Sequence, residues 1–106
     1  MKVLLDECIP RKFRSRLPGR ECHTVPDLDL AGRKNGELLL LAEQAGFQVF
    51  LTVDQGIEYE QNLRQLGIAV ILIRARSSRL IDLLPHVPEI PAALGAIEGG
   101  NLIHVG

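Results

Sequence analysis

Short apolar runs alternate with helical patterns along this chain of 106 residues. The runs fall at residues 3–5, 21–25, 47–53, 68–73 and 102–105. Two of them, at 47–53 and 68–73, are apolar on both faces, which is typical of strands in a parallel sheet buried between helices. The alternation therefore predicts an α/β fold with three layers, α/β/α, and a mainly parallel central sheet of four to five strands.

The length and the composition predict one domain, residues 1–106, with an aliphatic core. A domain of this size buries roughly two thirds of its unfolded-state surface, and 46% of the residues are hydrophobic whereas only 4% are aromatic. No run approaches the ~18 apolar residues of a membrane span. The first residues predict a strand rather than a cleavable leader, so we expect a cytoplasmic protein with no membrane segment.

Helical patterns fill the segments between the predicted strands. A short basic helix is expected over residues 10–17. A second helix begins at Asn35, a favourable N-cap residue, and ends before Gly46. Apolar residues at helical spacing predict a third helix over 58–66. A last helical segment after residue 79 is expected to be broken by its prolines and to resume over 92–97.

Two of the apolar runs stop at an acid. The first breaks at Asp6 and Glu7, and the run at 47–53 breaks at Asp54. The carboxyl ends of parallel strands share one edge of the sheet, where ligands bind, and the N-terminus of the helix that carries Glu37 can face the same edge. We therefore expect the carboxylates of Asp6, Glu37 and Asp54 to converge.

Carboxylates that converge repel one another unless a proton or a cation compensates their charge. Mg²⁺ and Mn²⁺ prefer oxygen ligands and keep coordination positions for water and phosphate oxygens. Such an ion polarises a phosphoryl group and lowers the pKa of a bound water. The three acids therefore predict a site that hydrolyses phosphodiester bonds. For each acid by itself, the alternative is a turn-forming or helix-capping role.

Three separated blocks of the sequence resemble the small PIN-like proteins that are related to toxin ribonucleases. The blocks cover residues 4–7, 30–39 and 52–55, and the last is followed by Tyr59, Gln61, Asn62 and Leu63. The resemblance extends over about residues 1–75. It implies a PIN-like fold and a ribonuclease site with Mg²⁺ or Mn²⁺ at Asp6, Glu37 and Asp54. It also implies an antitoxin protein as a partner, and a homodimer as the state of many relatives.

The chain departs from the family pattern in its acids. Fuller PIN nucleases generally supply a fourth acid, whereas this chain has Arg74 and Arg76 after the later strand. Some relatives carry an acid where Asn35 stands. A catalytically silent PIN-like module that binds a protein or a nucleic acid is therefore an open alternative.

Further polar residues lie near the predicted acids. Four of them are candidates for supporting the acids, with hydrogen bonding at the surface or capping as the alternative: Glu7, Asn35, Gln55 and Asn62. Phosphate contacts supply most of the sequence-independent affinity for nucleic acids. Four cations are candidates for such contacts to RNA, with solvated surface charge as the alternative: Arg11, Lys12, Arg33 and Lys34.

The same acids also describe a phosphoacceptor receiver domain, which has an acid pair after its first strand and an aspartate at about this later position. Such a domain uses a lysine at a later strand end to neutralise the acyl phosphate, whereas the last lysine of this chain is Lys34. Arginine differs from lysine in geometry and in its pattern of donors. The receiver-like domain is therefore the weaker alternative.

Overall fold

The computed structural model of the chain describes residues 1–60 and 63–106. It contains a five-stranded sheet in which every neighbouring pair of strands is parallel, in the order β2-β1-β3-β4-β5. The predicted α/β class and parallel sheet are confirmed. The strands are β1 Lys2–Leu5, β2 Glu21–Thr24, β3 Val49–Thr52, β4 Ala69–Ile73 and β5 Leu102–Val105.

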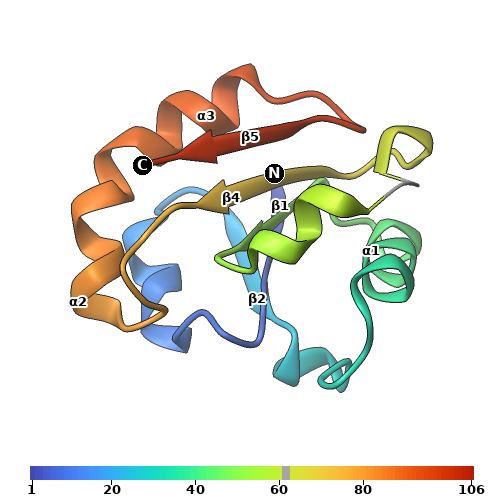
Figure 1. Ribbon diagram of the computed structural model, residues 1–106, viewed down its shortest axis with the longest axis horizontal. Helices are drawn as coiled ribbons and strands as arrows, with labels where there is room; N and C mark the ends of the chain where they lie inside the picture. Colours follow the sequence, from blue (N-terminus) through green and yellow to red (C-terminus); the bar gives the residue numbers. More distant parts are fainter. Residues whose placement is uncertain (61–62) are drawn as a thin grey trace.

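Helices connect the strands and cover both faces of the sheet (Figure 1). The α-helices of the described residues are α1 Asn35–Gln44, α2 Leu80–Leu83 and α3 Ile90–Ala96. The other helical connections are 3-10 helices, a tighter turn that occurs mostly in short pieces of chain. They are η1 Arg11–Arg16, η2 Pro26–Leu28, η3 Gln55–Tyr59, η4 Leu63–Gln65 and η5 Leu84–Glu89.

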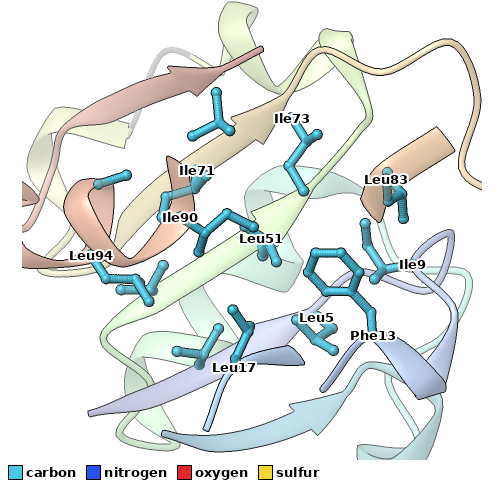
Figure 2. Close-up of a cluster of buried hydrophobic side chains, with 14 residues drawn as sticks. Leu5, Ile9, Phe13, Leu17, Leu51, Ile71, Ile73, Leu83, Ile90 and Leu94 are labelled. Atoms are coloured by element: carbon cyan, nitrogen blue, oxygen red, sulfur yellow. The ribbon is translucent and has the colours of Figure 1, made fainter. Parts of the chain in front are cut away.

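The strands supply side chains to two cores, because successive residues of a strand point to opposite faces of the sheet. On one face, Leu5, Leu51 and Ile71 pack with Phe13 of η1 and Ile90 of α3 (Figure 2). The other face joins the sheet to α1 and η3, and its buried residues include Leu4, Leu38, Leu39, Phe50 and Ile57. The two clusters produce the three layers that the sequence predicts.

The order of the strands across the sheet reverses between β1 and β3. The chain leaves β1 for β2 on one side, whereas β3 pairs with β1 on the other side. In open α/β sheets such a switch point opens a crevice at the carboxyl ends of the two strands, and ligands bind there. Asp6 follows β1 directly and Asp54 follows β3 by two residues, so both acids lie at this switch point, and the sheet edge that carries them is called the crevice.

Two details of the predicted helices are wrong. Lys34, not Asn35, is the N-cap residue of α1, and no side chain caps this helix. The Asn35 side chain is instead engaged with Asp54. In the described part of 58–66 there is no α-helix. Asp54 instead caps the 3-10 helix η3, which begins at Gln55, before the start of the predicted helix. Tyr59, which that spacing placed on an apolar face, is 81% exposed.

The prolines of the last helical segment do not break it as expected. The elements α2, η5 and α3 follow one another without a gap over residues 80–96. Pro85 and Pro91 each stand in the first turn of a helical element, where a backbone N–H is not needed and the fixed φ of proline is favourable. The segment therefore changes helix type at its prolines and continues.

Candidate functional site

Asp6 is a buried carboxylate at the end of β1. The residue is 6% exposed. Its backbone N–H donates to the carbonyl oxygen of Leu51 at 2.9 Å, which extends the pairing of β1 with β3 by one residue. The neighbouring strand therefore fixes the backbone from which the Asp6 side chain projects.

Three uncharged donors bind the Asp6 carboxylate. The backbone N–H of Glu7 donates to Oδ1 at 2.8 Å, and the hydroxyl of Thr52 donates to Oδ2 at 2.6 Å. The thiol of Cys8 donates to Oδ2 over 3.6 Å. Within residues 1–60 and 63–106, no Lys, Arg or His forms an ion pair with Asp6.

Burial raises the pKa of the Asp6 carboxyl above its ordinary value. The carboxylate of Asp54 raises this pKa further, whereas the hydrogen bonds that Asp6 accepts lower it. Burial of an anion is costly unless the anion is paired or bound to a cation. Asp6 is thus a group whose charged form a bound cation would stabilise.

Thr52 connects the two aspartates of the crevice. It is the last residue of β3 and is fully buried. Its hydroxyl donates to Asp6 and accepts the backbone N–H of Asp54 at 3.0 Å. A hydroxyl has one hydrogen and two lone pairs, so both bonds form at once. Thr52 was not among the residues predicted from the sequence, although a threonine that ends an apolar strand two residues before an aspartate is a usable signal.

Asp54 is exposed and is held by two neutral donors. Its Oδ1 accepts the backbone N–H of Gly56 at 2.9 Å, which caps η3. Its Oδ2 accepts the amide of Asn35 at 3.2 Å, so the first residue of α1 reaches the end of β3. A carboxylate has about four lone-pair sites. The Asp54 side chain therefore keeps acceptor capacity for a ligand from solvent.

Glu37 lies in the first turn of α1, as the sequence predicts. Its carboxylate is exposed and forms an ion pair with the guanidinium of Arg33. In the described part of the chain, no three His, Cys, Asp or Glu side chains lie close enough together to hold one metal ion. The expected convergence of three carboxylates is therefore not seen. Asp6 and Asp54 form a pair, and a ligand role for Glu37 stays a prediction.

The other residues that were predicted to support the acids have different positions. Glu7 is exposed, and its carboxylate accepts the backbone N–H of Gly32 at 3.3 Å, which ties the loop before α1 to the end of β1. Gln55 is the exposed first residue of η3 and follows Asp54 directly. Asn62 lies outside the described residues.

Glu60 is a further acid near this site that the sequence analysis missed. A Cβ atom placed on Gly36, the second residue of α1, would lie 3.1 Å from a carboxylate oxygen of Glu60. The Glu60 carboxylate thus lies over the first turn of α1, where the helix dipole favours an anion. Gly36 follows Asn35 directly. No local spacing in the sequence relates these positions, since the contact exists only once α1 and β3 are packed together.

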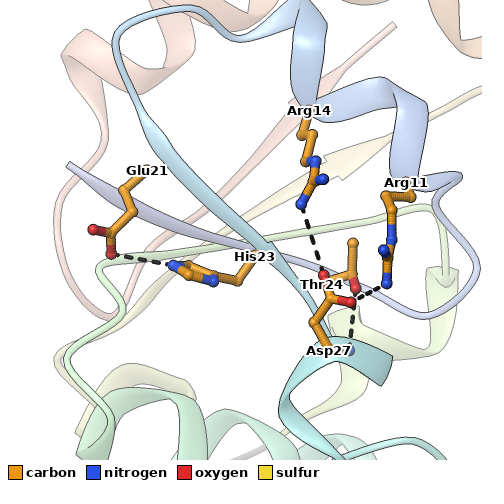
Figure 3. Close-up of polar contacts among 6 residues, drawn as sticks. All are labelled: Arg11, Arg14, Glu21, His23, Thr24 and Asp27. Carbon is orange, nitrogen blue, oxygen red and sulfur yellow. Dashed lines mark hydrogen bonds and ion pairs between the residues drawn. The ribbon is translucent and has the colours of Figure 1, made fainter.

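The cations that were predicted to bind RNA fall into two groups. Arg11 pairs with Asp27, whose other carboxylate oxygen lies 3.8 Å from Arg14 (Figure 3). A hydrogen bond from Thr24 lowers the pKa of Asp27, and the two arginines lower it further. Arg33 is paired with Glu37.

Lys12 and Lys34 are exposed. Neither of them has a carboxylate partner in the described parts of the chain. Both ammonium groups are therefore available for an anion from solvent, Lys12 on η1 and Lys34 beside α1.

The donor set of the crevice fits a hard divalent cation. Mg²⁺ is usually bound by one or two carboxylates, with water and substrate phosphate in the other positions. Asp6 supplies a buried carboxylate without a cationic partner in the described residues, and Asp54 supplies an exposed one. The Asp54 carboxylate also makes the charged form of Asp6 more costly. A divalent cation held by both would remove that repulsion.

Comparison of the chain with family models, with curated proteins and with solved structures found no significant match in any of the three. In residues 1–60 and 63–106, no helix is both long enough and apolar enough to cross a membrane.

Proposed function

We propose that this protein is a metal-dependent ribonuclease of the PIN-like type, which hydrolyses RNA phosphodiester bonds with Mg²⁺ or Mn²⁺ at the crevice between β1 and β3. The observation that carries the proposal is the environment of Asp6. This buried carboxylate has uncharged donors, no cationic partner in the described residues, and the Asp54 carboxylate beside it. A divalent cation and a phosphate oxygen complete such a site.

The residues of the crevice have separate roles in this proposal. A bound Mg²⁺ or Mn²⁺ supplies polarisation of the phosphoryl group and a more acidic bound water. Asp6, which is buried, and Asp54, which is exposed, are the two residues that would hold the cation. Thr52 fixes the Asp6 carboxylate and the backbone of Asp54, because its hydroxyl donates to the first and accepts the N–H of the second. Asn35 orients Asp54 through its amide.

The biological role that we propose is that of the toxin in a toxin–antitoxin pair, acting on RNA in the cytoplasm. This part rests on the resemblance of residues 4–7, 30–39 and 52–55 to small PIN-like proteins. An antitoxin protein that covers the crevice and a homodimer belong to the same proposal. Covering the crevice would block Asp54, which is the exposed acid of the pair.

Cleavage of labelled RNA by the purified protein tests the proposal. We expect cleavage with Mn²⁺ or Mg²⁺, none after chelation, and none for Asp54→Asn, because the amide does not replace a carboxylate as a ligand. Asp29→Asn is the matched control. Asp29 is exposed and has a φ of 60°, a conformation that asparagine tolerates, so this variant should cleave like the parent. If Asp54→Asn cuts RNA at the parent rate, the site assignment is wrong.

A catalytically silent PIN-like module is the second candidate, and the pairing of Glu37 with Arg33 favours it, because that contact leaves the crevice with two acids. A silent module should bind Mn²⁺ poorly and leave RNA intact under every condition of the cleavage assay. The ribonuclease should bind Mn²⁺ and lose cleavage on chelation. Titration with Mn²⁺ therefore separates the two candidates even if the right RNA has not been found.

A receiver-like phosphoacceptor domain has one observation in its favour, the strand order β2-β1-β3-β4-β5, which receiver domains share. Its phosphoacceptor would be the exposed Asp54. Against it, no lysine follows Lys34, and Arg74 stands where β4 ends. Incubation with a small acyl phosphate donor, followed by mass spectrometry, should add no phosphate to Asp54.

A further inference from the structure

Positive charge gathers in a groove beside η1, apart from the acids of the crevice. The groove has a volume of about 510 Å³. Its walls come from η1 and from the start of α2, and Figure 1 shows these two elements side by side. The residues that line it are Arg11, Lys12, Arg14, Ser15, Arg16 and Leu80.

The groove begins at the same edge of the sheet as the crevice. The first residue of η1 comes five positions after Asp6, and α2 follows the carboxyl end of β4. Phe13 and Leu17 anchor this segment in the core beneath it. A strand bound at Asp6 and Asp54 would pass over the carboxyl ends of β1 and β3 to reach the groove, because η1 packs on the face of the sheet that carries Leu5 and Leu51.

One carboxylate faces the four cations of this groove. Asp27 is engaged with Arg11 and Arg14 (Figure 3). Lys12 and Arg16 have no carboxylate partner in the part of the chain that the structure describes. The groove therefore keeps an excess of positive charge that an anionic ligand can neutralise.

Two arginines of the groove lie next to Asp27. Residues three apart eclipse each other along a 3-10 helix, so Arg11 and Arg14 lie on the same side of η1. Asp27 pairs with Arg11 and lies 3.8 Å from Arg14, and both guanidinium side chains stay exposed. An anion with more than one charge can therefore reach both of them from solvent.

We propose that this groove binds the sugar–phosphate backbone of an RNA strand that continues from the crevice of Asp6 and Asp54. The choice of RNA rests on the proposed function, and the charge of the groove complements a chain of phosphates. The lining side chains are mostly cations and none is aromatic, which favours contacts to phosphates, and such contacts are independent of sequence. The groove thereby gives a role to Arg14 and Arg16.

A membrane surface fits this groove less well than RNA does. Helices that bind in the plane of a bilayer insert an apolar face among the lipids. The apolar residues of η1 and of the residue that follows it, Phe13 and Leu17, are buried in the core of the protein. The exposed side of η1 carries arginine, lysine and serine only.

Binding of a short labelled single-stranded RNA, measured by fluorescence anisotropy in EDTA, tests this proposal without cleavage. The test variant is Lys12→Ala/Arg16→Ala. The matched control is Arg20→Ala/Arg64→Ala, which removes the same charge at positions outside the groove. We expect the test variant to bind more weakly at low salt. The slope of log affinity against log salt should become shallower by about 0.7 for each lost phosphate contact.

The outcomes separate the groove from the ribonuclease activity. RNA binding that falls in the test variant and not in the control supports the groove. If neither the parent nor any variant cleaves RNA, that result counts against the ribonuclease proposal alone and leaves the groove supported. If the test variant has the same RNA affinity and the same salt slope as the parent, the proposal that the groove binds RNA is overturned. An equal loss in the control would also overturn it, as would binding of the parent to anionic phospholipid vesicles and not to RNA.

Discussion

The hydroxyl of Thr52 lies 2.6 Å from the Asp6 carboxylate and at the same time accepts the backbone N–H of Asp54 at 3.0 Å. One buried side chain therefore connects the end of β1 with the residue that follows β3. The two acids of the crevice depend on the same hydrogen-bonded group, so changes at Thr52 should alter both the stability of the fold and the properties of the site.

Thr52→Val removes this hydroxyl and keeps a β-branched side chain of similar size. We expect the free energy of unfolding to fall by about 1–3 kcal/mol, since a buried polar group that loses its partner bears its desolvation cost. Urea denaturation measures this change. Thr52→Ser keeps the hydroxyl and should lose less stability than Thr52→Val. Equal stabilities for the parent and Thr52→Val would mean that the hydroxyl contributes nothing.

Asp6→Asn should change how stability depends on pH when no divalent cation is present. Burial raises the pKa of Asp6 in the folded state above its value of 3.8 in the unfolded chain, so the folded state binds the proton more tightly. The contribution of Asp6 is fully present below the unfolded-state pKa and is lost as pH rises through the folded-state pKa. The Asp6→Asn variant has no carboxyl group at this position, so its stability does not fall in this way as pH rises.

We therefore expect Asp6→Asn to gain stability relative to the parent between about pH 4 and neutral pH. Urea denaturation in EDTA at several pH values measures the difference between the two proteins. Asp29→Asn serves as the control, since Asp29 is exposed. If the difference in the free energy of unfolding between Asp6→Asn and the parent stays constant over this pH range, the assignment of Asp6 as a buried, uncompensated acid is contradicted.

Asp27→Asn should show the opposite dependence on pH. A hydrogen bond from Thr24, and then the charges of Arg11 and Arg14, lower the pKa of Asp27 below 3.8. Its contribution is therefore present above the unfolded-state pKa and is lost as pH falls through the folded-state pKa. We expect the variant to be less stable than the parent at neutral pH and equal to it in strong acid. Thermal melts at the two pH values measure this difference in stability. A melting temperature of Asp27→Asn that stays below that of the parent in strong acid would refute the prediction.

Asn35→Asp should strengthen the binding of Mn²⁺. The Asn35 amide lies 3.2 Å from an oxygen of Asp54, so a carboxylate at this position would add a third acid to the pair. We expect tighter Mn²⁺ binding by calorimetry and a lower melting temperature in EDTA, because the added charge repels Asp54. Asn35→Ala is the control and should bind Mn²⁺ no more tightly than the parent. Weaker binding by Asn35→Asp would exclude this geometry.

The positions of Asp6 and Asp54 could be predicted from the sequence because the sheet alone determines them. A residue that follows a buried parallel strand lies at the carboxyl edge, whatever packs against the strand. The strands themselves were found from apolar runs, and β5 at Leu102–Val105 has the bounds that the sequence predicts. These features depend on local sequence and on one rule of topology.

The partners of the two acids depend on packing and could not be predicted in the same way. The direction of Glu37 is set by how α1 docks and by Arg33, which lies in the loop just before α1 and competes for its carboxylate. The Asn35 side chain bonds to Asp54 rather than capping α1, and this contact depends on how the start of α1 docks beside the end of β3. The contact of Glu60 with Gly36 joins segments 24 residues apart and has no local signature.

Calorimetric titration of the metal-free protein with Mn²⁺ is the sharpest test of a metal site at Asp6 and Asp54, because it requires neither an RNA substrate nor a partner protein. The parent and Asp29→Asn should bind Mn²⁺ alike, while Asp6→Asn and Asp54→Asn should each lose most of that affinity and remain folded by circular dichroism. A parent that binds no Mn²⁺, or two crevice variants that bind it as tightly as the parent, would contradict the account.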